Sequence, residues 1–119
     1  MDLTGRERRA LRTHVLAELI RLEEQVASLS RSFADIVAGA ELTNTDDEHD
    51  PEGATIAFER AQVSALLRQA QEDLDAMRLT EVRIEQPGYG VCERCAGFIG
   101  VERLLALPST PLCVACARL

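Results

Sequence analysis

Hydrophobic residues recur at alternating steps of four and three through the first part of the chain. They form one series: Val15, Leu19, Leu22, Val26, Leu29, Phe33, Ile36 and Ala40. This spacing places apolar side chains on one stripe of a helix and is typical of a coiled-coil seam. Thr4 and Glu7 have the spacing of a capping box at a helix start, and Gly39 favours a helix end. The pattern predicts a first helix over about residues 4–39.

A second apolar series predicts a second helix. Asp50, Pro51 and Glu52 read as an N-cap, a first-turn proline and a first-turn carboxylate. The series that follows is Ile56, Val63, Leu67, Ala70, Leu74, Met77 and Ile84, with Glu81 as a polar interruption and Pro87-Gly88 as the end. Neither helix can bury its stripe alone, so we expect the two to pair antiparallel as a hairpin. The alternative, that the stripes are dimer seams, stays open.

All four cysteines fall in two C-x2-C pairs, which 17 residues separate: Cys92, Cys95, Cys113 and Cys116. Two residues between thiols let a tight turn aim both sulfurs at one ion, and two such turns complete a tetrahedral thiolate shell. We expect one structural Zn²⁺ per chain, because four thiolates leave no open position on the metal. A redox dithiol and a pair of disulfides are weaker alternatives, since the chain has no thioredoxin-like βαβ pattern.

The residues between the cysteine pairs include two short apolar pieces, Gly97–Val101 and Leu104–Leu107. We expect them to form a small hairpin. The predicted fold class is therefore mainly α, a long antiparallel helical hairpin (coiled coil) with a small four-cysteine zinc-finger knob. The hairpin would take residues 1–86, with an acidic tip at 41–52, and the zinc-finger module residues 87–119.

Composition and charge exclude several function classes. An aromatic content of 3% without tryptophan argues against a large globular core. A formal charge of −7 argues against binding of DNA through its phosphates. The charged segment 1–12 lacks the core of a secretory signal, and no apolar run is long enough to span a membrane. We expect a soluble cytoplasmic protein. It is not expected to be an enzyme, since no nucleophile–base set or phosphate loop is present.

Five acidic residues lie close together between residues 46 and 52, at the start of the second predicted helix and just before it: Asp46, Asp47, Glu48, Asp50 and Glu52. A solvated loop with helix-capping carboxylates is the simplest interpretation. At the end of a long hairpin, however, such acids can be delivered into a cleft that a globule could not enter. There they could pair with arginine or lysine of a partner, or perturb a hard cation.

These features together resemble the DksA/TraR family of bacterial regulators that act on RNA polymerase. The resemblance rests on Tyr89-Gly90-Val91-Cys92-x2-Cys95, Ile99-Gly100-x2-Arg103-Leu104, Pro108-x3-Leu112-Cys113-x2-Cys116, and Asp46–Thr55 leading into Phe58-Glu59-Arg60. The zinc module matches in spacing and in the residues between the cysteines, whereas the helices match mainly in length and period.

The resemblance implies a function and a set of contact residues. Family members insert the hairpin into the secondary channel of RNA polymerase, without binding DNA specifically, and tip acids alter promoter complexes. Counted back from the first cysteine, the family's D-x-x-D-x-A tip falls on His49, Glu52 and Ala54. A small shift would bring Asp47 or Asp50 to the first position. We expect Asp50, Glu52 and Ala54 to make the tip contacts, with Asp47 next.

Two further expectations concern partners. Basic residues with which some relatives share the alarmone ppGpp with polymerase stand here as Ala76, Leu107 and Ala117. A polyphosphate needs cations, so we expect little ppGpp-dependent binding. We expect a monomer that acts on polymerase. The alternatives are a zinc-ribbon adaptor or self-associating helical module that does not act on polymerase, and a thiol redox sensor.

Overall fold

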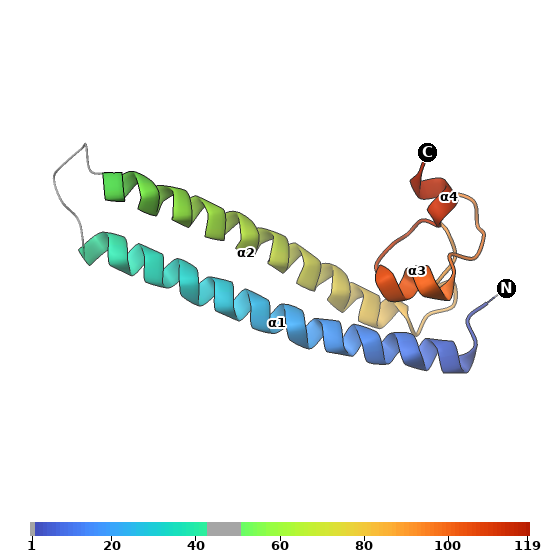
Figure 1. Cartoon of the computed structure of the whole chain (residues 1–119). Helices are drawn as coiled ribbons and strands as arrows, with labels where there is room; N and C mark the ends of the chain where they lie inside the picture. The colour runs from blue at the N-terminus through green and yellow to red at the C-terminus, as the bar shows by residue number, and fades with distance from the viewer. Residues whose placement is uncertain (1, 43–50) are drawn as a thin grey trace. The chain divides into compact units, whose positions relative to one another are not determined.

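The computed structural model describes residues 2–42 and 51–119, which are mainly α-helical (Figure 1). Its helices are α1 (Gly5–Leu42), α2 (Pro51–Arg83), α3 (Val101–Ala106) and α4 (Val114–Ala117). Within the described residues the β structure is one isolated antiparallel bridge between Val91 and Phe98. None of the described helices combines the length and the apolar character needed to cross a membrane.

The start of α1 is capped as its sequence predicts. The backbone N–H of Thr4 donates to Glu7 Oε1 at 2.8 Å, and the Glu7 N–H donates to Thr4 Oγ1 at 3.1 Å. This reciprocal pair satisfies two N–H groups that have no partner inside the helix. The helix continues three residues past the expected end at Gly39 and reaches Leu42. The second helix begins at Pro51, the position that proline favours.

The chain divides into two compact units, and both long helices contribute to each. One unit contains Met1–Ile20 with Leu74–Leu119, and the other is Arg21–Asp73. The first unit therefore joins the start of α1 and the end of α2 to the two short helices. The second unit contains the remaining lengths of α1 and α2, which run side by side (Figure 1).

Three layers, formed by α1, the end of α2 and α3, meet in the core of the first unit. Leu11 and Val15 of α1, Ile84 after α2, and Leu104 of α3 each have a relative exposure of 0%. Around these four lie further buried apolar side chains: Leu3, Leu19, Leu74, Met77, Tyr89 and Ile99. The buried stripe of α1 therefore begins at Leu11, four residues before Val15, where the series predicted from the sequence starts. The third layer matters because two helices alone can cover only one stripe of each other.

The second unit illustrates that limit. Near its start, Leu22 and Ala70 are buried. The seam residues beyond them are only half-buried: Val26, Leu29, Phe33, Ile36, Ile56, Val63 and Leu67. Even so, these residues line the seam that the four-three spacing predicts. The predicted fold class, a helical hairpin with a four-cysteine module, is confirmed.

Two details of the prediction are wrong. The α2 seam passes through Thr80, which is 1% exposed, whereas Glu81 is exposed to solvent. The buried positions run from Leu74 to Met77 to Thr80, which are two successive steps of three residues. A strict alternation of four and three would place the next seam position at Glu81, one residue further on.

The residues expected to form a small hairpin between the cysteine pairs instead include helix α3. The backbone turns at Gly100, where φ is 105°. The Leu104 N–H then donates to the Gly100 carbonyl at 3.0 Å, which is a helical bond. This helix buries Leu104 completely in the core of the first unit. Apolar runs this short cannot be assigned to a strand or a helix from their pattern alone.

Candidate metal centre

The first cysteine pair lies in a tight turn that the backbone closes on itself. The Cys92 N–H donates to the Gly97 carbonyl at 2.8 Å, and the Ala96 N–H donates to the Cys92 carbonyl at 2.9 Å. The Gly97 N–H points to Cys95 Sγ at 3.4 Å. To close this turn Ala96 adopts a left-handed φ of 62°, which is strained for a residue with a Cβ. The turn therefore directs the sulfur atoms of Cys92 and Cys95 toward one metal-binding position.

The second pair is built by the start of α4. Cys113 immediately precedes this helix, and its carbonyl accepts the Ala117 N–H at 2.9 Å. Cys116 lies one turn later, so its sulfur falls on the same side as that of Cys113. Two bonds join the pairs: the Glu93 N–H donates to the Pro111 carbonyl at 2.9 Å, and Arg94 Nη1 donates to the Cys116 carbonyl at 3.4 Å.

The four sulfur atoms are spaced as ligands of one ion. All of them lie within 4.8 Å of one another, and Cys95 Sγ is 3.8 Å from Cys113 Sγ. Tetrahedral zinc with Zn–S bonds of about 2.3 Å requires sulfur pairs about 3.8 Å apart. Cys92 and Cys116 are buried, Cys113 is half-buried and Cys95 is exposed. The donor set fits a closed tetrathiolate zinc site.

The thiols of this cluster differ in pKa. Backbone hydrogen bonds, from Cys95 first and then from Cys113, lower the pKa of Cys92 from 9.0 to about 6. Burial, reinforced by the neighbouring thiols, raises the pKa of Cys116 to about 12. A bound divalent cation would remove this difference in protonation, because thiols that coordinate a metal are held deprotonated. The site thus fits Zn²⁺, which when bound would serve as a structural crosslink.

Side chains outside the cluster hold the metal-binding loops in place. Arg103 Nε donates to the Leu112 carbonyl at 2.8 Å, just before the second cysteine pair. The Tyr89 hydroxyl donates to the Pro108 carbonyl at 2.8 Å, and burial raises the pKa of Tyr89. Gly90 has φ of 92°, and a Cβ there would approach Leu104 Cδ1 and Phe98 Cε2 to 3.4 Å.

Comparison with known proteins supports the same assignment. Residues 87–119 match the family model described as the prokaryotic dksA/traR C4-type zinc finger. A solved structure, that of transcription factor DksA2 from Pseudomonas aeruginosa, superimposes with a TM-score of 0.79 at 20% sequence identity. The match covers 96% of this chain and 82% of that chain. A comparison with curated proteins found no match.

The fold and the site define a C4 zinc-finger protein built on a long helical hairpin. The predicted structural Zn²⁺ is confirmed by the four clustered sulfurs together with the family match. More particularly, the chain carries the DksA/TraR zinc finger on the fold of DksA2, which confirms its resemblance to the DksA/TraR family.

The acidic tip is described only in part. Asp47 and Asp50 lie outside the described residues, and Glu52 is in the first turn of α2. Ala54, one turn into α2, is exposed. The assignment of these four residues as partner contacts stays a prediction, and the division at residue 86 does too.

Sequence reasoning did not assign roles to several residues that support the zinc module. Thr80, Tyr89 and Arg103 each bond to the backbone or side chains of the segment between the cysteine pairs. The signal in the sequence is faint for each of them. Each of these bonds joins residues at least nine positions apart in the sequence, so no local spacing could predict it.

Proposed function

We propose that this chain regulates transcription by binding RNA polymerase, with the end of its helical hairpin entering the secondary channel. The observation that carries this proposal is the combination of a DksA/TraR C4 finger with two long paired helices. The fold is shared with a transcription factor over 96% of this chain. In this proposal the protein is a cytoplasmic effector, and residues 1–86 and 87–119 form its two functional parts.

The proposed contact surface is the segment that joins α1 to α2, with the first turns of α2. Its acids, Asp47, Asp50 and Glu52, would pair with basic groups or perturb the metal ions of the partner. Ala54 is exposed, and Phe58, one turn further along α2, is 70% exposed. An aromatic side chain left in water favours contact with a partner, because burying its ring is favourable.

The mechanism that we propose is a shift in population. Polymerase at a promoter exchanges between conformations, and a bound protein favours whichever conformation it binds better. The acidic tip would supply that difference in affinity, while the zinc module and the helices would position the tip. Catalysis by this chain has no part in the mechanism.

A double variant at the tip tests the proposal. Asp50→Ala with Glu52→Ala should leave affinity for purified polymerase within about twofold and abolish the change in transcript yield in vitro. Glu23→Ala with Glu24→Ala is a matched control, because both residues are exposed acids on α1. The control should behave like the wild type. If wild type leaves transcription unchanged, or if the tip variant regulates normally, the proposed mechanism is wrong.

Crosslinking separates the proposal from its alternatives. A photo-crosslinker at Glu52 should label polymerase peptides that line the secondary channel, whereas one at Glu23 should label them far less. A zinc-ribbon adaptor would instead recover other proteins in a pull-down, and a self-associating module would crosslink to itself. Adding ppGpp should change polymerase affinity little, since alanine and leucine stand at Ala76, Leu107 and Ala117.

A further inference from the structure

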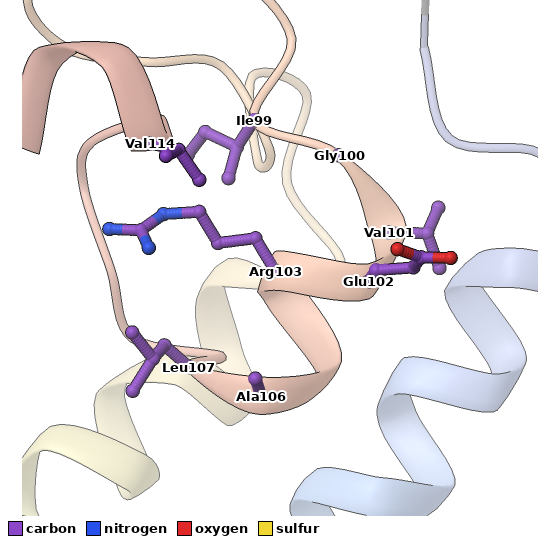
Figure 2. A pocket seen from close by; sticks show the side chains of 8 residues that line it. All are labelled: Ile99, Gly100, Val101, Glu102, Arg103, Ala106, Leu107 and Val114. Atoms are coloured by element: carbon purple, nitrogen blue, oxygen red, sulfur yellow. The ribbon is translucent and has the colours of Figure 1, made fainter.

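The zinc module carries an apolar groove beside the metal-binding loops. This open groove has a volume of about 630 Å³ and is lined by residues of α3, by the residues on either side of α3 and by the start of α4 (Figure 2). The lining residues are Ile99, Gly100, Val101, Glu102, Arg103, Ala106, Leu107 and Val114. This volume is within the range of sites that hold small ligands or a few side chains.

The apolar walls of this groove are open to solvent. Leu107 is 51% exposed and Val114 is 44% exposed, whereas Ile99 is buried. In Figure 2, Leu107 and Val114 lie on opposite sides of the Arg103 side chain. Grouped apolar side chains that remain in water are a common mark of a binding surface.

The positive charge of Arg103 lies between these walls. This half-buried side chain bonds through Nε to the Leu112 carbonyl at 2.8 Å and through Nη2 to Thr110 Oγ1 at 3.4 Å. Both partners are uncharged, and no carboxylate in the described part of the chain pairs with this guanidinium. A guanidinium has five N–H donors, so this one keeps donors for a further acceptor. The groove also has one carboxylate, Glu102, which points away from the Arg103 guanidinium (Figure 2). Around Arg103 the groove therefore combines apolar walls with an available positive charge.

We infer that this groove binds a peptide segment of a partner protein that presents a leucine-sized apolar side chain beside a carboxylate. The apolar side chain would pack over the Arg103 stem against Leu107 and Val114, and the carboxylate would pair with the Arg103 guanidinium. A carboxylate suits this position because Arg–carboxylate pairs in partly desolvated sites form strong, oriented bonds. This inference goes beyond the proposed function, since it concerns the zinc module and does not require polymerase.

A peptide fits these dimensions better than a second copy of the chain or a free anion. Stable protein interfaces bury about 800 Å² on each partner, which is more than a groove lined by eight residues offers. A free anion would use the guanidinium but leave the apolar walls in water. Only a ligand with both an apolar part and a negative charge uses the whole groove.

Four matched peptides test the inference on the full zinc-loaded chain. Each is a fluorescein-labelled, alanine-rich helix with one variable pair one turn apart: Leu with Glu, Leu with Gln, Leu with Lys, or Ala with Glu. Fluorescence anisotropy should show saturable binding of the Leu–Glu peptide. The Leu–Gln and Ala–Glu peptides should bind at least fivefold more weakly, and the Leu–Lys peptide weakest of all. Equal affinities, or no saturable binding, would overturn the inference.

Variants of the protein locate the binding site. Leu107→Ala should weaken the Leu–Glu peptide about fivefold, whereas Leu79→Ala should leave its affinity unchanged. Leu79 is a matched control because it is 59% exposed and does not line the groove. Metal content and circular dichroism check that both variants are folded. Equal effects of the two variants would contradict the assignment.

Two further measurements test the other occupants. Inorganic phosphate at millimolar concentration should not displace the Leu–Glu peptide, and its full displacement would mean that the groove is only an anion site. Sedimentation should find that Leu107→Ala leaves the oligomeric state unchanged. If wild type dimerises and Leu107→Ala is monomeric, the occupant is a second copy and the inference is wrong.

Discussion

The hydroxyl oxygens of Thr80 and Ser109 lie 2.6 Å apart, joining the buried face of α2 to the loop before the second cysteine pair. Thr80 Oγ1 also donates to the Ala76 carbonyl at 2.8 Å, and Ser109 Oγ lies 3.4 Å from the same oxygen. Thr80 is 1% exposed, so its hydroxyl cannot turn to water instead. A polar group in the seam is tolerated because the Ala76 carbonyl and the Ser109 hydroxyl of the zinc module are both its partners.

Removing this hydroxyl should weaken the first unit. Thr80→Val keeps the side-chain shape but deletes the buried bond to Ser109, so the free energy of unfolding should fall by about 1–2 kcal/mol. Urea denaturation of the zinc-saturated protein measures the change. Thr13→Val is the control, because the Thr13 hydroxyl also bonds to a carbonyl one turn earlier but is exposed. It should change stability by less than about 0.5 kcal/mol. Equal losses would exclude a special role for the Ser109 contact.

Loss of one ligand should remove the metal. Cys92→Ser replaces a buried thiolate donor, and we expect zinc content to fall from about one per chain to near zero after dialysis. The amide signals of residues 87–119 should then lose their dispersion, since zinc binding is part of the folding energy of such a module. Ala115→Ser, between Cys113 and Cys116, adds a hydroxyl without removing a ligand and should retain zinc. Full zinc occupancy in Cys92→Ser would contradict the four-sulfur site.

The strained turn of the first cysteine pair offers a stabilising change. Ala96→Gly relieves the left-handed φ of 62°, and the free energy of unfolding should rise by about 0.5–1 kcal/mol. Ala10→Gly in the exposed interior of α1 should lower it by about 1 kcal/mol, because glycine is a poor helix former. Thermal unfolding in excess zinc measures both. The same sign for the two variants would refute the strain argument.

The burial of Tyr89 predicts that the protein loses stability at alkaline pH. Burial raises its pKa above 10.0, although the charges of Arg83 and Arg8 act in the opposite direction. The folded state favours the neutral phenol. The stabilisation that Tyr89 contributes is therefore complete below pH 10 and is lost as the pH rises through the pKa of Tyr89 in the folded protein. The chain contains one tyrosine and no tryptophan, so near-ultraviolet absorbance reports this ionisation directly. The absorbance midpoint should lie above 10 in the folded protein, and a midpoint below 10 would contradict the burial argument.

The comparison variant Tyr89→Phe keeps the ring but leaves the Pro108 carbonyl without its hydroxyl donor. At neutral pH the variant should be less stable by about 1–2 kcal/mol. Above pH 10 the difference from wild type should shrink, since the wild-type phenol then loses its proton as well. A stability difference that does not change with pH would show that the ring alone matters.

The features that the sequence predicted correctly are those set by local spacing. Two C-x2-C pairs determine how the sulfurs face, and Thr4 with Glu7 forms a cap whatever lies elsewhere in the chain. The alternating series likewise predicts the buried stripe, because helix geometry fixes which side chains share a face. The hairpin and the four-cysteine cluster follow from these patterns alone.

The features that the sequence did not predict depend on distant partners. Thr80 replaces Glu81 in the seam because Ser109, 29 positions away, satisfies its hydroxyl. Helix α3 forms where a small hairpin was expected, because Leu104 packs in a core that α1 and α2 complete. The groove beside Arg103 likewise exists only once α3 and α4 have folded together. No periodicity within a single segment carries this information.

The burial of Leu3, Leu11 and Val15 in the core of the first unit has a consequence for how the protein folds during synthesis. The first unit joins residues up to Ile20 to residues from Leu74 onward, which leave the ribosome more than 50 residues later. The middle of the chain can pair as soon as α2 emerges, since its partner on α1 is already present. Until the residues from Leu74 onward have been made, Leu11 and Val15 in the early turns of α1 stay exposed to solvent. Chaperone protection during translation should therefore be needed most at the amino-terminal turns, which are the last to find their neighbours.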